Sequence, residues 1–290
     1  MKTIIVATDF SPAAFNAANY AAEMAMAINA DILLLHVYQI PVVYLEIPVA
    51  LAADDIQYAA EENMKKVKEE LLAKTNGHLR IETAVKEGSF IEELKTACEY
   101  KKPYVVVLGS QGKTAAERLI YGTHTVYAMK HLMCPVIAVP RNAKFSNIKR
   151  IGLACDFNDV LGTVPVEEIK VLVNDFNAEL HVLNTASKEE YNPDALDQSA
   201  LLQRMFGKVN PIYHFIADND VDTGVTNFAE MNNIDLLIVI PKHHSLIDKL
   251  IHSSHTKQLV LHSQVPVAAF HHHFDASKEL GLNTAGNLKS

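Results

Sequence analysis

The sequence is poor in the residues that mark several large classes of protein. Its three cysteines, Cys98, Cys134 and Cys155, are too few and too scattered for a disulfide framework or a zinc site. A net charge of -8 argues against a general nucleic-acid binder, because such proteins carry an excess of positive charge. With only 11 glycines and 11 prolines in 290 residues, the composition also argues against a long disordered region.

Long hydrophobic runs are missing too. The first ten residues, MKTIIVATDF, reach Asp9 before the apolar core of a signal peptide could form. The longest weakly polar stretch, IPVVYLEIPVALAA, is interrupted by Glu46 and two prolines and is too short to cross a bilayer. We therefore expect a cytoplasmic protein with no membrane and no nucleic-acid partner. A chain of this length is expected to form two domains of about 140 residues.

Two common phosphate-binding motifs are absent from the stretch GSQGKTAAERLIYGT, residues 109–123, although it holds three of the 11 glycines. The tripeptide Gly112-Lys113-Thr114 resembles the end of a Walker A loop, but the position that needs the first glycine is Val107. The spacing of the dinucleotide fingerprint is missing as well. A nucleotide held by this loop would need a different geometry.

The chain contains two similar halves. Four pairs of segments match: residues 3–10 with 150–157, 30–37 with 178–185, 122–125 with 253–256, and 135–139 with 266–270. Two tandem copies of one fold explain these matches. We define copy one as residues 1–140 and copy two as residues 150–274, and we expect a hinge at residues 141–149 and a flexible tail at residues 275–290.

Within each copy, short apolar runs alternate with amphipathic segments of helical spacing. In copy one, helices are expected at residues 12–29, 54–74, 89–100 and 115–133, the first of them capped by Ser11. Strands that alternate with helices are typical of βαβ units. The pattern therefore predicts an α/β fold in which each copy has a parallel sheet with helices on both faces.

Ligands of open parallel sheets bind outside the carboxyl ends of the strands, where the strand order reverses. In copy one, the residues expected just past these ends are Asp9, Val37, Gly88 and Gly109. Glycines at 109 and 112 would let backbone N–H groups approach phosphate oxygens, and the following helix would direct its positive end toward them. Asp9 could accept hydrogen bonds from ribose hydroxyls or hold a metal.

Each of these residues also has a structural explanation. A single acidic residue after a strand is often a helix cap or a turn residue, and a glycine there often only makes a turn. Lys113 and Arg118 are accounted for by a solvated helix face. A ligand is favoured by the occurrence of six residues together in one copy: Asp9, Gly88, Gly109, Gly112, Gly122 and Thr123.

On these residues the sequence resembles the universal stress protein family, over nearly its whole length and as two tandem domains. The ATP-binding members carry Gly, two residues, Gly, nine residues, Gly, then Ser or Thr, and Gly109, Gly112, Gly122 and Thr123 match that spacing. The resemblance implies a Rossmann-like fold of the adenine-nucleotide α-hydrolase type, with five parallel strands in each copy. It also implies that the copies pair through their last strands, residues 136–139 and 267–270.

The resemblance further implies a set of nucleotide contacts in copy one. Asp9 would contact the ribose or the phosphates, the backbone of Val37 the adenine, and Thr123 with Thr125 the phosphate tail. Gln111 stands where the family often has a histidine. The candidate binding residues are Asp9, Val37, Gly88, Leu108, Gly109, Gln111, Gly112, Gly122, Thr123, His124 and Thr125. The implied ligand is ATP or AMP, with the need for Mg²⁺ left open.

Copy two departs from this pattern. At equivalent positions Gly88 becomes Asn219, Gly109 becomes Ile240, Gly112 becomes His243 and Gly122 becomes Ser253. Side chains therefore occupy positions where a phosphate would need bare backbone. Although Asp156 persists, we expect copy two to bind no nucleotide.

Copy two is also rich in histidine. The residues are His243, His244, His252, His255, His262, His271, His272 and His273. Imidazoles bind transition metals readily, but no carboxylate or cysteine lies beside them at ligand spacing. An exposed polar surface with incidental metal affinity is the favoured interpretation, and a metal site is the alternative.

The apolar segment PVVYLEIPVALA, residues 41–52, is largely missing from copy two. It could be a lid over the adenine, a contact with another chain in a homodimer, or a buried connection. The sequence leaves these three alternatives open.

Three functions are compatible with these observations. The first is a stress-response regulator whose ATP- or AMP-bound state changes its shape or its partners. The second is a scaffold in which neither copy binds nucleotide, and the third is an enzyme of the related hydrolase superfamily, such as a slow ATPase. Phosphoryl transfer needs a positioned base and a metal clamp, and the sequence offers no clear base beyond Asp9 or His124. This absence weakens the third function but not the first, which does not require enzymatic turnover.

Overall fold

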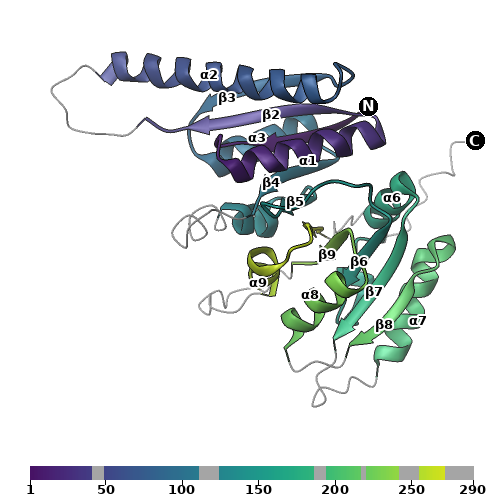
Figure 1. The fold of residues 1–290 in the computed structure, drawn as a ribbon. Coiled ribbons are helices and arrows are strands. Elements are labelled where there is room, and N and C mark those ends of the chain that lie inside the picture. The colour runs from purple at the N-terminus through teal and green to yellow at the C-terminus, as the bar shows by residue number, and fades with distance from the viewer. Residues whose placement is uncertain (41–48, 111–123, 186–193, 217–219, 242–254, 272–290) are drawn as a thin grey trace, which may run out of the picture.

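A computed structural model describes residues 1–40, 49–110, 124–185, 194–216, 220–241 and 255–271 (Figure 1). The elements of copy one are β1 Lys2–Ala7, α1 Pro12–Ile28, β2 Ala30–Tyr38, α2 Val49–Lys74, β3 Ile81–Glu87, α3 Phe90–Lys101, β4 Val105–Gly109, a helix at residues 124–131, and β5 Val136–Val139. Those of copy two are β6 Arg150–Ala154, α5 Val160–Thr163, α6 Val166–Phe176, β7 Glu179–Thr185, α7 Ala195–Phe206, the short 3-10 helix Gly207–Val209, β8 Ile212–Ile216, α8 Val221–Met231, β9 Leu236–Val239, α9 His255–His262 and β10 Val267–Ala269.

The ten described strands form one sheet, in the order β3-β2-β1-β4-β5-β10-β9-β6-β7-β8. Neighbouring strands within each copy are parallel. At the centre β5 and β10 are antiparallel, with Ala138 opposite Val267 and Val136 opposite Ala269. The predicted fold class and the predicted pairing of the last strands are both confirmed. Because the junction is antiparallel, the strands of copy two end at the opposite edge of the sheet from those of copy one.

Helices cover both faces of the sheet. Because successive residues of a strand point to opposite sides, each strand contributes side chains to the cores on both faces. In β1, Ile4 and Val6 contribute to the core under α1, α2, α6 and α7. Ile5 and Ala7 contribute to the core under α3, the 124–131 helix, α8 and α9. The strands are therefore apolar on both sides, as buried parallel strands usually are. Within the described part of the chain, no helix combines the length and the apolar character that crossing a membrane requires.

The first helix of copy one begins and ends as its sequence predicts. The Ser11 hydroxyl accepts a hydrogen bond from the backbone N–H of Ala14 at 3.2 Å, and Pro12 occupies the first helical turn. Asn29 ends the helix in the left-handed conformation, and Asn177 does the same for α6 in copy two.

Helix α2 begins at Val49, five residues before the predicted start at residue 54. Residues 49–52 therefore belong to a helix, whereas residues 41–48 of the same apolar segment lie outside the described residues. The sequence interpretation had assigned residues 49–52 to the apolar segment because they are uniformly apolar and show no amphipathic spacing. None of the three explanations for this segment is tested.

The connection between the copies, residues 141–149, contains neither helix nor strand, yet it is packed rather than freely solvated. The Phe145 ring lies 5.3 Å from that of Tyr20 in α1 and 6.2 Å from that of Phe176 in α6. Ile148 is 1% exposed. This connection, expected to be a polar hinge, therefore contributes apolar side chains that contact both copies.

An ion pair adds to the same junction. The Lys2 ammonium of β1 pairs with the Asp175 carboxylate of α6, and it lies 5.1 Å from the centroid of the Tyr104 ring. Burial raises the pKa of Tyr104 well above its usual value, and the neighbouring Asp175 raises it further. The phenol therefore stays neutral at physiological pH, and the only charges in this cluster are the paired ones.

Candidate functional site

The strand order of copy one reverses between β1 and β4. From β1 the chain proceeds to β2 and β3 on one side, and then crosses to β4 and β5 on the other. In open α/β sheets, ligands bind outside the carboxyl ends of the two strands at this point. Asp9 follows β1 by two residues, and Gly109 is the last residue of β4. Two of the predicted site residues therefore flank the switch point.

Asp9 stabilises the turn that leads into α1. Its Oδ1 accepts a hydrogen bond from the backbone N–H of Ser11 at 2.9 Å. Between them, Phe10 has a φ of 64°, in the left-handed region, and its N–H donates to the Thr8 hydroxyl at 3.0 Å. The carboxylate is exposed, so it can contact a ligand while it holds the turn.

His36 is a residue of this edge that the sequence interpretation missed. Its Nδ1 donates to the carbonyl of Thr8 at 2.8 Å, which fixes the proton on that nitrogen and leaves Nε2 as the other polar atom of the ring. The Phe10 ring packs on the imidazole, with centroids 4.3 Å apart. A histidine near the carboxyl end of an otherwise apolar strand was the signal that could have identified it.

Val37 lies inside β2, which continues to Tyr38, rather than just past its end as predicted. Leu35 bonds to the β1 side, where its carbonyl accepts from Thr8, and Tyr38 bonds to the β3 side, where its carbonyl accepts from Gly88. Backbone groups of a parallel strand alternate between its two neighbours, so those of Val37 face the β1 side, where β1 has already ended. This orientation leaves them directed toward the switch point.

Gly88 directly follows β3 and has a φ of 145°, which residues with a side chain rarely adopt. Its N–H donates to the carbonyl of Tyr38 at 3.0 Å, so it closes the end of the β2–β3 pair. The need for glycine here is therefore explained by the backbone. Ser89, the next residue, is the N-cap residue of α3.

Gly109 is required by packing between β4 and α1. A Cβ at this position would lie 2.9 Å from the backbone carbon and oxygen of Ala13, closer than real contacts allow. Leu108, one residue earlier, is 4% exposed and lies in the core of the other face. The glycine thus lets the backbone of the first turn of α1 lie against the end of β4.

The start of the 124–131 helix is joined to the end of β4. The buried Thr125 hydroxyl donates to the carbonyl of Gly109 at 2.8 Å. His124 is exposed and its ring meets that of Phe90 edge-on, with centroids 5.4 Å apart. Between these elements, the predicted site residues Gln111, Gly112, Gly122 and Thr123 lie outside the described residues.

Ser110 is a second residue that the sequence interpretation did not single out. Its N–H donates to the carbonyl of Val139 at 3.0 Å, and its side chain is fully buried. Its hydroxyl oxygen has no hydrogen-bond partner among the described residues. A buried hydroxyl of this kind costs free energy unless it finds a partner, and it stands where β4 enters residues 111–123.

The corresponding strand ends of copy two keep the turn, but the residues around it differ. Asp156 accepts from the N–H of Asn158 at 3.1 Å, and Phe157 between them has a φ of 56°. Asn184 replaces His36 and donates to the carbonyl of Cys155 at 2.9 Å. Ile240 replaces Gly109 and its side chain packs against the core.

The first helix of copy two is also interrupted. It consists of the short α5 and then α6, with Pro165 between them, whereas α1 is continuous. Copy two therefore accommodates a side chain at position 240, where copy one has helix backbone against Gly109. The replacement of glycine by isoleucine at this position in copy two is therefore accompanied by a break in the first helix.

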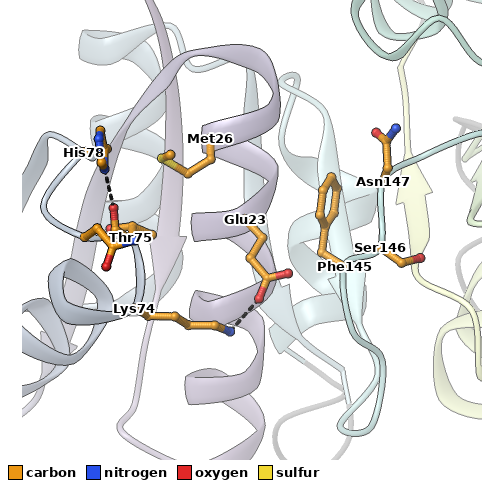
Figure 2. A pocket seen from close by; sticks show the side chains of 9 residues that line it. Glu23, Met26, Lys74, Thr75, His78, Phe145, Ser146 and Asn147 are labelled. Atoms are coloured by element: carbon orange, nitrogen blue, oxygen red, sulfur yellow. Dashed lines mark hydrogen bonds and ion pairs between the residues drawn. The ribbon is translucent and has the colours of Figure 1, made fainter.

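A hollow of about 590 Å³ lies away from the predicted site (Figure 2). Its lining residues are Glu23, Met26, Lys74, Thr75, Asn76, His78, Phe145, Ser146 and Asn147. They come from the last turns of α1, from the end of α2 and the residues that follow it, and from the connection between the copies. Because α1 begins at the carboxyl edge of the sheet, its end lies at the amino edge. This hollow is therefore separate from Asp9 and Gly109.

The described histidines of copy two do not gather into a metal site. His262 is exposed, and the Nε2 of the buried His271 lies 2.8 Å from the carbonyl of Met129. The described residues hold no group of three or more His, Cys, Asp or Glu side chains that could bind a metal. The predicted histidines that lie outside the description are His243, His244, His252, His272 and His273, and nothing is described of the side chain of His255.

Two histidines that were not singled out do meet inside copy two. His181 of β7 and His214 of β8 stack with an interplanar angle of 17°, and their nitrogens Nδ1 and Nε2 lie 2.9 Å apart. Burial lowers the pKa of His214, and the neighbouring His181 lowers it further. This pair lies within the sheet, on the face covered by α8, and not at the predicted site.

Comparison with known proteins finds one family that matches both copies. The model of the universal stress protein family matches residues 1–140 and again residues 147–271. The chain belongs to the universal stress protein family. A curated universal stress protein of Methanocaldococcus jannaschii is 31% identical over 146 residues, which is 49% of this chain and 84% of that protein.

Solved structures of the family show the same fold over nearly the whole chain. A universal stress protein from Archaeoglobus fulgidus superposes with a TM-score of 0.73 at 18% identity, covering 94% of this chain and 97% of its own. A putative universal stress protein from Pseudomonas aeruginosa reaches a TM-score of 0.57 at 11% identity, with 93% of each chain covered. The two-copy arrangement is thus shared with these full-length structures.

Proposed function

We propose that copy one binds one adenine nucleotide, ATP or AMP, outside the carboxyl ends of β1 and β4, and that copy two binds none. The bound state would then regulate the shape or the partners of the protein in a stress response. The observation that carries the proposal is the switch point itself, with Asp9 on one side and Gly109 on the other. The glycine spacing of residues 109–123 supports the same position.

Three groups have the position and chemistry for separate parts of a nucleotide. The exposed Asp9 carboxylate can accept hydrogen bonds from ribose hydroxyls. The backbone of Val37 faces the switch point and can bond to the adenine edge. The first turn of α1, which lies against Gly109, directs the positive end of a helix to the same side.

Copy two lacks two of these features. The side chain of Ile240 occupies the position of Gly109, and the first helix is broken at Pro165. Asp156 remains and forms the same turn as Asp9, so the aspartate does not distinguish the two copies. We therefore propose a stoichiometry of one nucleotide for each chain.

Isothermal titration calorimetry with ATP and AMP, each with and without Mg²⁺, tests this proposal on a matched pair of variants. Asp9→Asn and Asp156→Asn each remove one carboxylate charge, while the amide oxygen can still accept the backbone N–H of the turn. A hydrogen bond to a charged group is worth about 1.5–3 kcal/mol, so Asp9→Asn is expected to weaken binding by roughly 10- to 100-fold. Asp156→Asn is expected to leave the affinity unchanged.

A third variant, Gly112→Val, is expected to abolish nucleotide binding while the fold is retained. Far-ultraviolet circular dichroism and the melting curve serve as the controls for folding. A nucleotide at a hundred times its dissociation constant stabilises the native state by about 2.7 kcal/mol, which a melt detects. Absence of saturable binding in the wild type, or an equal loss in Asp156→Asn, would contradict the proposal.

The scaffold function is the second candidate, and a specific observation favours it. Asp9, Gly88, Gly109 and Thr125 each have a role in turns or packing that needs no ligand. A protein with no adenine-nucleotide affinity in any of these titrations would leave the scaffold as the better explanation. Slow hydrolysis of ATP would be visible in the same samples as release of phosphate.

A further inference from the structure

Two of the three cysteines lie side by side, although 35 residues separate them in the chain. Cys98 is in the last turns of α3, and Cys134 directly precedes Pro135 and β5. Their sulfur atoms are 3.2 Å apart and the two thiols are hydrogen-bonded. Both are free thiols and both are partly exposed. The sequence argued only against a disulfide framework or a zinc site, and it gave no sign of this contact, which arises because the fold brings α3 beside the segment before β5.

We propose that Cys98 and Cys134 are a reversible redox pair, which hydrogen peroxide oxidises to an intrachain disulfide between α3 and the segment before β5. The sulfur atoms of a disulfide lie about 2.05 Å apart, so the thiols need to approach by only a little more than about 1 Å. Partial exposure lets a small oxidant reach them. This inference is independent of the proposed nucleotide site.

The surroundings assign different roles to the two sulfurs. The pKa of Cys134 is lowered, first because the Cys98 thiol can donate a hydrogen bond to its thiolate. The pKa of Cys98 is raised, first by the same hydrogen bond and then by burial, and Glu99 nearby adds to it. Cys98 lies in the last turns of α3 beside Glu99, where the negative end of the helix disfavours a thiolate, so we expect Cys134 to attack peroxide and Cys98 to resolve the product.

The reaction balances with one peroxide for each disulfide. The Cys134 thiolate attacks one peroxide oxygen, the O–O bond breaks, and hydroxide leaves and takes up a proton to become water, which leaves a sulfenic acid on Cys134. The sulfur of Cys98 then attacks the sulfenic sulfur, an S–S bond forms, the S–O bond breaks, and the hydroxide leaves with the Cys98 proton as a second water. Each sulfur gives up one electron, and a dithiol reductant reverses the step by thiol–disulfide exchange.

The new bond would join α3 to the segment that follows the 124–131 helix, and these two helices already meet at their other ends. The rings of Phe90, at the start of α3, and His124, at the start of the 124–131 helix, are in edge-on contact. Cys134 follows the end of that second helix by three residues. Oxidation would therefore fix the far ends of both helices, and it is expected to raise the melting temperature of copy one.

The test is a thiol count on the full-length protein. Reduced protein, freed of reductant, is exposed to hydrogen peroxide, and the remaining thiols are alkylated in denaturant and counted by intact mass. Three alkylated thiols are expected before oxidation and one afterwards, with a cross-linked peptide that contains Cys98 and Cys134. Dithiothreitol is expected to restore all three.

Variants separate this pair from the third thiol. Cys155→Ser is the control, because Cys155 lies in copy two, and it is expected to lose both remaining thiols on oxidation. Cys98→Ser is expected to stop at a sulfenic acid on Cys134, which dimedone traps. Three results with the wild-type protein would each overturn the proposal: all three thiols stay alkylatable, the disulfide includes Cys155, or cross-links form only between chains. Because all three are measured on the wild type, they do not depend on whether a variant folds.

Discussion

In both copies the first strand is followed by an aspartate that accepts a backbone hydrogen bond two residues on, and by a phenylalanine in the left-handed conformation. Asp9 and Phe10 form this turn in copy one, and Asp156 and Phe157 form it in copy two. A feature that persists where the glycines have been lost serves the fold. The aspartate alone is therefore weak support for a ligand, and the residues that differ between the copies carry more information.

The differences gather at the ends of the second and fourth strands. His36 in copy one corresponds to Asn184 in copy two, and both donate to the last carbonyl before the turn. Gly109 corresponds to Ile240, and this exchange goes together with a broken first helix. Histidine and asparagine make the same hydrogen bond with different side chains. The exchange of Gly109 for Ile240, in contrast, changes whether the backbone of the first helix can approach the end of the fourth strand.

The largest effect is expected from truncation of the two turn phenylalanines. Phe157 is 1% exposed and lies against the rings of Tyr213 and Phe215, each 6.1 Å away between centroids. Phe157→Ala is expected to cost about 3–5 kcal/mol of unfolding free energy, because it leaves a cavity. Phe10 is only partly buried, so Phe10→Ala is expected to cost about 1–2 kcal/mol. Guanidinium denaturation measures both, and equal losses would show that the two turns are packed alike.

Glycine-to-alanine substitutions are expected to have the next largest effect. In Gly109→Ala the new methyl group meets the backbone of Ala13, which cannot move easily, and a loss of about 1–3 kcal/mol is expected. Gly152→Ala in β6 is the matched control, because its methyl group would meet only side-chain tips, at 3.2–3.3 Å. It is expected to cost less than about 1 kcal/mol. Urea denaturation of both variants decides whether contact with α1 explains Gly109.

An exchange of the histidine for its counterpart in copy two is expected to be milder. His36→Asn can keep the hydrogen bond to the carbonyl of Thr8, as Asn184 does for Cys155, and is expected to cost less than about 0.5 kcal/mol. His36→Ala leaves that carbonyl without its side-chain donor and is expected to cost about 1 kcal/mol. If the alanine and asparagine variants melt at the same temperature, the hydrogen bond is not what the two copies share.

The smallest effect is expected from pH, and only in copy two. His214 has a lowered pKa in the folded protein, so the unfolded chain binds more protons below its ordinary value of 6.5. The stability that the neutral ring contributes is therefore complete above that value and is lost as pH falls through it toward the folded pKa. The groups facing the ring are His181 and Phe228, with Glu179 3.6 Å beyond on the Nε2 of His181.

Denaturation of the wild type at about pH 5.5 and 7.5 measures this effect, and His214→Gln is the comparison. The wild type is expected to lose more stability at the lower pH than the variant does. A parallel fall in both proteins would assign the pH dependence to other groups.

Much of the fold could be predicted from the sequence because the signals are local or repeated. Ser11, Pro12 and Asn29 define the first helix through capping chemistry that depends only on neighbouring residues. The pairing of residues 136–139 with 267–270 followed from the family resemblance, and the structure shows it between residues 136–138 and 267–269. The early start of α2 was missed, since residues 49–52 are uniformly apolar and were assigned to the preceding segment.

The candidate site was predictable in position but not in the role of each residue. Sequence alone could not show that the backbone of Ala13 leaves no room for a side chain at position 109. Nor could it show that the Thr125 hydroxyl donates to the carbonyl of Gly109, because both contacts join distant segments. The same limit hid His36 and the pair Cys98 and Cys134. Contacts of this kind depend on how helices pack on the sheet, which periodicity does not specify.

The antiparallel junction of β5 and β10 has a consequence for how such a protein can change. Two separate identical subunits would carry every substitution twice, and they would come apart on dilution. Joined in one polypeptide, the halves face each other at a high effective concentration that dilution does not alter. A residue such as Ile240 can then arise in one half while Gly109 is retained in the other, so the fused chain can specialise its halves separately without losing their shared sheet.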